Sequence, residues 1–166
     1  MKLQYLIILM ILVSCSTFIK KTHAVSILQN DKFVITKKDS LDIDSVRHSN
    51  IKFDEANKNY SELIIDGGTK AAEFYGGFSN FRSIIHKKFK TNYKSKNGEN
   101  IVNITLGKYD NVEDVKIIKF TDEYSKRKII KILKMNDFKR WRSATINFIK
   151  VKYEFEFIIS ISDKNP

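Results

Sequence analysis

Few side chains in this sequence have the types and spacing that chemistry requires. The three histidines are scattered, and no pair has the spacing of metal ligands. One cluster combines two aspartates, a serine and a histidine: Asp42, Asp44, Ser45 and His48. A catalytic triad is defined by geometry and oxyanion donors, which this cluster does not suggest, so we interpret it as a polar loop. The sequence therefore predicts no catalytic residue, no metal and no cofactor, and we expect that the protein is not an enzyme.

The single cysteine, Cys15, has a context that favours covalent modification. It follows a positively charged start and an apolar run over residues 6–13, which is the layout of a secretory leader. This run is too short to cross roughly 30 Å of hydrocarbon, which needs about 20 residues. The ending Leu12-Val13-Ser14-Cys15 is similar to a bacterial lipoprotein signal, which implies cleavage before Cys15 and its acylation. Two alternatives stay open: an uncleaved anchor that reaches Ile19, and an ordinary leader with an incidental cysteine.

Such a leader predicts a lipid-anchored protein of the cell envelope that faces the periplasm. Ser16 is not the acidic residue associated with retention in the inner membrane, so the outer membrane is favoured. No second cysteine is available for a disulfide, and the domain must be held together by packing. We expect four segments: a signal peptide (1–14), a tether with partial structure (15–69), a folded domain (70–162) and a tail (163–166).

The chain is strongly basic, with a formal net charge of +11 at pH 7. In an envelope protein, a basic surface favours anionic lipids, wall polymers or acidic partner segments. An AT-rich coding sequence, which enriches lysine, asparagine and isoleucine, is the alternative source of this charge. The export signal argues against nucleic acid as a partner.

The sequence before residue 70 is polar and weakly patterned. It predicts a short strand over 31–37 and a second strand at 63–65 that ends in a glycine turn. Later in the chain, Phe78, Phe81, Ile85 and Phe89 recur at helical spacing and predict an amphipathic helix over 78–91.

The remaining elements follow from alternation and capping. Strands are expected over 101–106 and 112–120, and Thr121 is expected to cap a helix that runs to about residue 136. Between residues 148 and 161 apolar residues occupy every second position, which predicts a long closing strand. The order α-β-β-α-β predicts an α+β fold in which two helices pack on a three-stranded antiparallel sheet.

Five short motifs in this order resemble the C-terminal domain of TonB-type energy transducers. They are Ala72–Gly77, Gly98 before strand 101–106, Asn111–Val115, Ile132-Leu133 followed by Trp141, and the closing strand 148–161. The sequence shows neither the inner-membrane helix nor the proline-rich spacer of a transducer. The resemblance therefore implies the fold and a binding role rather than energy transduction.

In that family the domain binds an extended segment of an outer-membrane transporter by strand addition. An edge strand offers unpaired N–H and C=O groups that an extended peptide can complete. The expected partner-binding residues on the closing strand are Phe148, Lys150, Lys152, Glu154 and Glu156. The alternative is a core strand whose edge is covered by residues 16–69 or by a second copy of the chain, so a homodimer is a possible state.

A second function hypothesis rests on a basic patch along the second helix of this domain and just after it. Its residues are Arg127, Lys131, Lys134, Lys139, Arg140 and Arg142. The first three share one helix face, and the last three flank Trp141, which we expect in the core. A cationic face beside an aromatic ring can hold phosphates or anionic sugars. The patch thus predicts a structural envelope lipoprotein that binds anionic wall or lipid polymers, and a solvated helix face is the alternative.

Overall fold

The structure is a computed structural model that describes residues 20–28, 30–56 and 68–164. It confirms the α+β class, with helices and a mostly antiparallel sheet. The helices in the described part of the chain are α2 (Lys37–Ala56), α3 (Gly77–Lys88), α4 (Glu123–Leu133) and a short 3-10 helix, η1 (Asn136–Phe138).

The sheet is built around one long strand, β9 (Ile149–Asp163). The other strands of this seven-stranded sheet are β1 (Lys21–Ile27), β2 (Lys32–Val34), β3 (Thr69–Lys70), β5 (Gly98–Leu106), β6 (Val112–Lys119) and β8 (Ala144–Ile146). A separate pair joins β4 (Glu73–Phe74) to β7 (Trp141–Arg142).

Strand β9 is paired along both of its edges. On one edge, β5 lies opposite residues 153–161, with β6 beyond it. On the other edge, β1 lies opposite residues 157–163, β2 opposite 152–154, and β8 opposite 149–151. The sheet therefore has seven strands where the sequence predicted three: the region expected to be a tether supplies β1 and β2, and the short strands β3 and β8 are the other two. Residue 70 consequently does not mark an edge of the fold.

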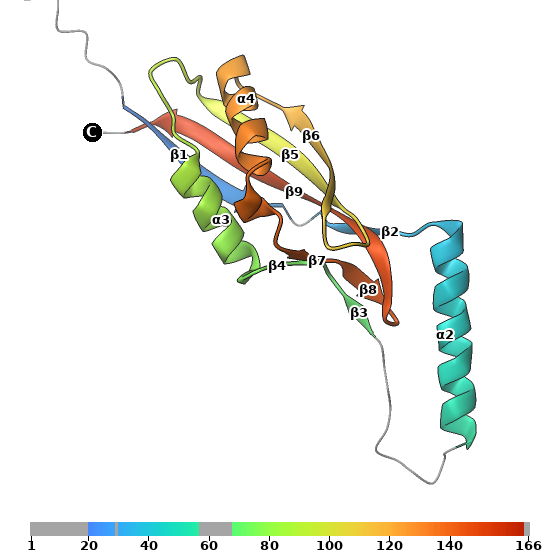
Figure 1. Cartoon of the computed structure of the whole chain (residues 1–166). Helices are drawn as coiled ribbons and strands as arrows, with labels where there is room; N and C mark the ends of the chain where they lie inside the picture. Colours follow the sequence, from blue (N-terminus) through green and yellow to red (C-terminus); the bar gives the residue numbers. More distant parts are fainter. Residues whose placement is uncertain (1–19, 29, 57–67, 165–166) are drawn as a thin grey trace, which may run out of the picture.

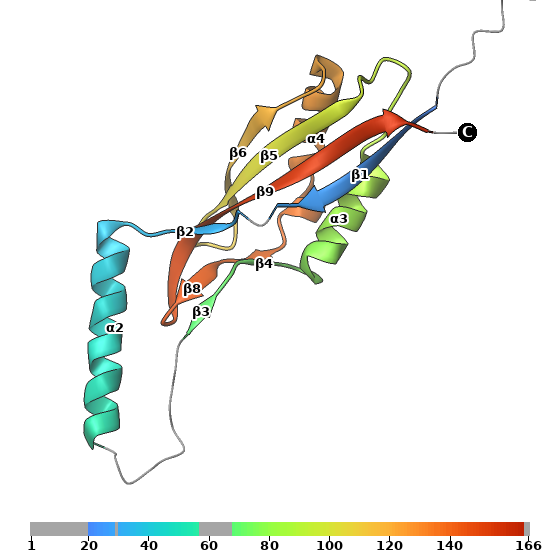
Figure 2. The same cartoon turned by 180° about the vertical axis from the view of Figure 1, so that it is seen from behind.

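Helices α3 and α4 lie on one face of the sheet (Figure 1). The view from the opposite side shows the strands in front of both helices (Figure 2). Every second residue of β9 from Val151 to Ile161 is buried, as the alternation predicted. Phe81 of α3 is fully buried in a cluster of aromatic rings. Trp141 is a core residue, as predicted, and its Nε1 donates a hydrogen bond of 2.9 Å to the Phe138 carbonyl.

The cap of α4 differs from the prediction by one residue. Asp122 is the N-cap, and its carboxylate accepts a 2.8 Å hydrogen bond from the Ser125 amide. Thr121 instead donates its hydroxyl to Oδ1 of Asn100, which is buried in β5. The helix ends at Leu133 and the chain continues into η1, so the predicted end near residue 136 is also shifted.

Helix α2 stands where the sequence predicted a polar loop. Thr36 and Asp39 form a reciprocal capping box, in which each backbone amide donates to the other residue's side chain. Burial alone raises the pKa of Asp39, but hydrogen bonds from Lys108 and Thr36 outweigh it and hold the pKa below its ordinary value. Because this cap starts a helix at Lys37, the strand expected over 31–37 is limited to β2.

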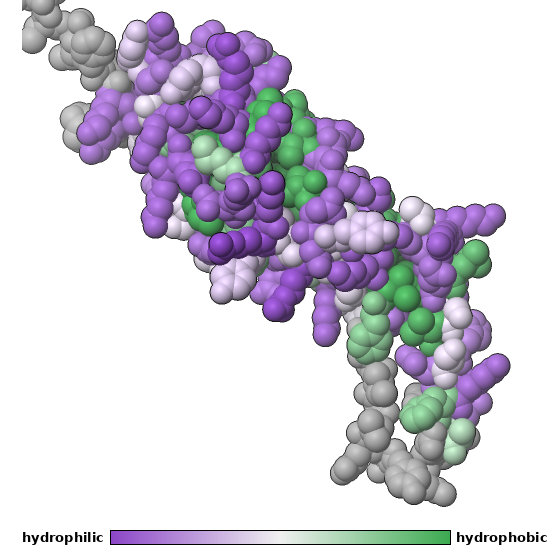
Figure 3. All heavy atoms as spheres, in the orientation of Figure 1, coloured by the Kyte–Doolittle hydropathy of each residue, from purple (hydrophilic) through white to green (hydrophobic). Residues whose placement is uncertain are grey.

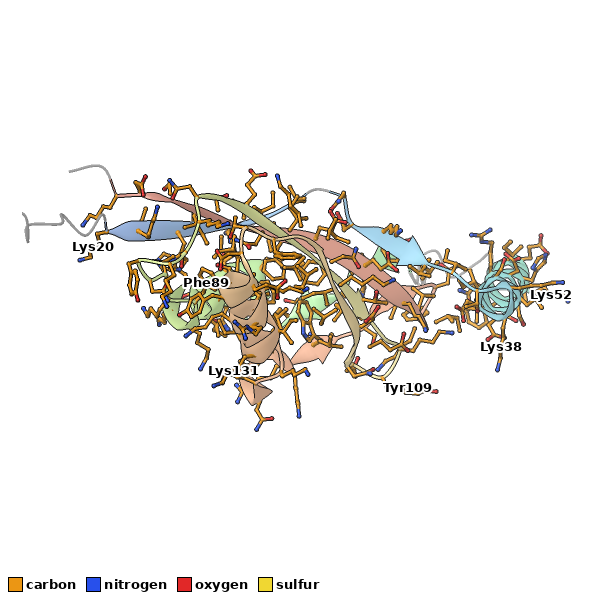
Figure 4. The ribbon with its side chains drawn as sticks, turned by 90° about the horizontal axis from the view of Figure 1, so that it is seen from above. Lys20, Lys38, Lys52, Phe89, Tyr109 and Lys131 are labelled. Atoms are coloured by element: carbon orange, nitrogen blue, oxygen red, sulfur yellow. The ribbon has the colours of Figure 1, made fainter. Side chains whose placement is uncertain are left out.

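The molecule is elongated. Figure 4 shows Lys20, just before β1, near one end, and Lys38 and Lys52 on α2 at the other. Among the α2 residues whose burial the structure describes, only Asp39 and Ile43 are buried, so most of these side chains face solvent. The strand predicted at 63–65 lies outside the described residues.

Candidate binding site

The residues predicted to bind a partner on the closing strand already have partners within the chain. Lys150 pairs with Asp110 at 2.9 Å, and Lys152 pairs with Glu113 at 2.5 Å. Glu154 pairs with Lys32 at 3.0 Å, and Glu156 accepts a 2.6 Å hydrogen bond from Asn30. Phe148 differs, since it lies in the β8–β9 turn and is 55% exposed.

The prediction of an open edge on this strand is therefore wrong for the described structure. Strands β1, β2 and β8 occupy the edge of β9 that β5 leaves free. The alternative, an edge covered by residues 16–69, matches this arrangement, since β1 and β2 come from that range. That residues of β9 contact a partner stays a prediction.

Strand β1 is held in part by His23, which nothing in the sequence placed beside another histidine. The rings of His23 on β1 and His86 on α3 lie 4.5 Å apart between centroids. His23 Nε2 donates a 3.1 Å hydrogen bond to the His86 carbonyl, and its ring packs edge-on against Phe89. Burial is the largest cause that lowers the pKa of His23, and the charges of His86 and Lys90 lower it further.

The lowered pKa of His23 predicts that β1 is held less firmly in acid. Unfolded His23 takes up a proton near pH 6.5, whereas folded His23 does so only at lower pH. Its contribution to stability is thus present above about pH 6.5 and is lost as the pH falls through the folded pKa. We expect the protection factors of the β1 amides, which correct for the slower intrinsic exchange in acid, to fall between about pH 7 and pH 5, and His23→Gln to reduce that fall. His48→Gln, on exposed α2, is the control, and an unchanged pH dependence in His23→Gln would contradict the assignment.

An open strand edge is present elsewhere, on β6. In the described part of the chain, β6 pairs only with β5, so its other edge has no strand beside it. Helix α4 lies beside β6 on the helix-covered face of the sheet (Figure 1), and Figure 3 shows apolar surface between the two elements.

A groove of about 600 Å³ runs between β6 and α4. Val112 and Val115 of β6 form one wall, and Ile130 and Leu133 of α4 form the other, with buried Phe138 of η1 also lining the groove. Val112, Val115 and Ile130 are half-buried, so their side chains are partly open to solvent in the groove. A volume of this size lies within the range of about 300–1,000 Å³ typical of ligand pockets.

The charged groups around this groove are not equivalent. Glu113 and Asp114, on the β6 side, pair with Lys152 at 2.5 Å and Lys116 at 3.6 Å. Lys134 and Lys139, on the helix side, are exposed and form no ion pair with any described residue. The unbalanced charge at the groove is therefore positive.

Asp110 fixes the turn at one end of the groove. Its backbone has a φ of 59°, and its carboxylate accepts a 2.7 Å hydrogen bond from the Ser143 amide. The hydrogen bond from Lys150 is the largest cause that lowers the pKa of Asp110 to about 2, and donors from Ser143 add to it. The turn that leads into β6 is thus tied to the segment between β7 and β8.

The structure divides the predicted basic patch into three parts. Arg127 and Lys131 are exposed on α4, and Arg127 Nε donates to the Glu123 carbonyl. Lys134 and Lys139 line the groove. Arg140 and Arg142 instead lie beside the β4–β7 pair, where Arg140 stacks over the Tyr75 ring at 5.8 Å and Arg142 pairs with Glu73 at 3.8 Å.

Other predicted features find no assembled site. Over residues 20–28, 30–56 and 68–164, no cluster of acidic residues, histidine or cysteine has an arrangement that could hold a metal. Asp42, Asp44, Ser45 and His48 lie on α2, where His48 Nδ1 bonds the Asp44 carbonyl at 2.7 Å. That the protein is not an enzyme stays a prediction.

The membrane predictions lie mostly outside what the structure covers. Cys15 and the leader are not among the described residues. Within the described ranges, no helix is both long enough and apolar enough to cross a bilayer. Comparison of the chain with protein-family models, with curated proteins and with solved structures finds no match in any of the three.

Proposed function

We propose that the protein is a membrane-tethered, periplasmic binding module that captures an extended segment of another envelope protein by strand addition. The observation that carries this proposal is the unpaired edge of β6 beside the apolar groove that β6 forms with α4. An edge strand supplies backbone affinity, and a neighbouring groove accepts alternate side chains of the added strand.

The resemblance to TonB C-terminal domains adds support without locating the site. Elements α3, β5, β6, α4 and β9 follow one another in the order that the resemblance implies, with the short β7 and β8 inserted before β9. We propose a TonB-like fold on this basis. The proposed binding edge is β6 rather than β9, because β9 is paired on both sides.

The charges around β6 favour a partner of one kind. Lys134 and Lys139 at the groove lack ion-pair partners among the described residues, so an acidic side chain on the added segment would be attracted there. Lys116 and Lys119 of β6 are already paired, with Asp114 at 3.6 Å and Glu99 at 3.8 Å, so Lys134 and Lys139 carry the unbalanced charge near this edge. We therefore propose an extended, acidic segment with alternating apolar residues, such as one from an outer-membrane transporter.

The proposal is tested by an amide-shift NMR titration of the isotope-labelled chain from residue 15, with Cys15→Ser to prevent acylation. The probe is a short synthetic peptide that alternates valine with threonine and glutamate. We expect shifts concentrated in β6 and α4, together with slower exchange of the outward-facing β6 amides.

The matched control is the same peptide with alternate backbone amides N-methylated. Methylation removes N–H donors and blocks pairing to a strand edge, while the side chains stay the same. Equal binding of both peptides would overturn strand addition. Binding of neither peptide, nor of peptides from the N-terminal segments of the host's outer-membrane transporters, would remove the basis of the proposal.

A second candidate function is a structural lipoprotein that holds anionic wall or lipid polymers. The observation in its favour is that Arg127 and Lys131 on α4, and Lys134 at its C-cap, are exposed and form no ion pair with a described residue. Salt separates the two functions, because screening shortens to about 3 Å at 1 M. Polyanion binding should be lost at that concentration, whereas backbone pairing and apolar contacts should persist.

A further inference from the structure

One end of the molecule collects positive charge around a shallow hollow. The hollow has a volume of about 590 Å³ and lies between β1, the last turn of α3 and the loop that follows it. Its basic lining residues are Lys20, Lys21, His23, His86 and Lys90. None of the described residues that line it is acidic.

Two of these lysines are available to a ligand. Lys21 is already neutralised, since its Nζ lies 2.5 Å from Asp163 and 2.8 Å from the side-chain oxygen of Asn97. Lys20 and Lys90 are exposed and form no ion pair with any residue that the structure describes. The hollow thus has two unneutralised ammonium groups on its walls.

Further lysines surround the hollow at the same end. The amide of Lys164, just after β9, donates a 2.7 Å hydrogen bond to the Lys20 carbonyl. The loop that carries Lys94 and Lys96 is attached to β1 through Thr91, whose hydroxyl donates to the Lys21 carbonyl at 3.1 Å. The side chains of Lys94, Lys96 and Lys164 are exposed and form no ion pair within the described ranges.

This basic end is also where the chain enters the fold. Cys15 lies five positions before Lys20, which Figure 4 places near the end of the molecule opposite α2. Five extended residues span at most about 18 Å. A lipid on Cys15 would therefore hold Lys20 and its neighbours within about that distance of the bilayer surface.

We propose that this end of the molecule lies against anionic phospholipid headgroups, with Lys20 and Lys90 on either side of a headgroup phosphate in the hollow. The attraction of basic residues to an anionic leaflet accumulates with each lysine near the surface. Binding of the headgroups by the lysines does not depend on the proposed lipid anchor. The anchor is needed only for the conclusion that this end of the molecule faces the membrane. The acyl chains hold the protein, and the basic end points its long axis away from the membrane, so the groove between β6 and α4 stays accessible.

Vesicle co-sedimentation tests this inference in the chain from residue 15 with Cys15→Ser, which retains every described residue. The probes are vesicles of phosphatidylglycerol mixed with phosphatidylethanolamine, and vesicles of phosphatidylcholine alone. We expect binding to the anionic vesicles only. The double variant Lys20→Glu/Lys90→Glu should bind them about tenfold more weakly or worse.

The matched control is Lys38→Glu/Lys52→Glu, which changes the net charge equally at the opposite end of the molecule (Figure 4). Equal losses in the two double variants would overturn the proposal, because net charge alone would then explain binding. Equal binding to phosphatidylcholine would also overturn it, because the attraction would then not depend on anionic headgroups. Neither double variant alters the β6–α4 groove, so peptide capture can fail or succeed independently of this result.

Discussion

Replacing Val115 with glutamate is expected to weaken capture of the valine-alternating peptide by about 20-fold or more. Val115 is half-buried in the wall of the groove, opposite apolar residues of α4. A carboxylate here would put charge into the apolar wall that the peptide covers and would compete with the acidic peptide residues for Lys134 and Lys139, at a cost of about 2 kcal/mol, which corresponds to this loss of affinity. Acidic residues of the peptide would be repelled as well. The measurement is the dissociation constant from NMR titration or calorimetry.

The control is Ile118→Glu on the same strand. Ile118 is 58% exposed and does not line the groove, so the same change of chemistry should leave affinity within about twofold. Thermal unfolding of both variants shows whether the fold is retained. If Val115→Glu remains folded and binds the peptide normally, the groove is not the site of capture.

Phe81→Ala is expected to cause the largest loss of stability, about 3–5 kcal/mol in the free energy of unfolding. The Phe81 ring is fully buried and contacts the rings of Phe74, Trp141 and Phe155, among others. Truncation removes these contacts and leaves a cavity between α3 and the sheet. The measurement is chemical denaturation, together with a fall in the thermal midpoint on the order of 10 °C.

Tyr109→Ala is the matched control for this prediction. Tyr109 is 87% exposed in the turn between β5 and β6, so its removal should change stability by less than about 0.5 kcal/mol. A loss below about 1 kcal/mol in Phe81→Ala would show that α3 does not pack on the sheet as described.

Elements with strong local patterns were predictable from the sequence. The alternation in β9 and the apolar spacing of α3 identify both elements, and each was predicted to within about three residues at its ends. The burial of Trp141 was predicted from its position between a helix and a strand, where a large aromatic ring can fill the space between the helices and the sheet. In these elements the local pattern and the packing point to the same structure.

The N-terminal elements were not predictable from the same signals. In β1 only Val25 and Ile27 are apolar among the half-buried residues, and Lys21 and His23 hide the alternation. Its stability comes from pairing with β9, which lies more than a hundred residues away in the chain. Helix α2 buries too little to show a periodic face, although the spacing of Thr36 and Asp39 was a usable signal of its start.

The groove was missed because its walls lie on two elements whose relative position the sequence does not state. One signal was present in α4. Ile129 and Ile130 are adjacent, so both cannot point equally toward the sheet, and Ile129 is buried while Ile130 lines the groove. When a helix carries more apolar side chains than its buried face can hold, the remaining ones indicate a binding surface.

The pairing of β1 with β9 also determines how the molecule would bear mechanical load. If the anchor lies before Lys20 and a captured partner pulls on the body of the protein, tension enters the fold through the first residue of β1. That tension acts along the strand, against an antiparallel ladder that runs from Lys21 to Ile27. The rungs of the ladder are then sheared together rather than peeled one at a time. With an anchor before Lys20, the pairing of β1 with β9 would therefore carry the force on the protein.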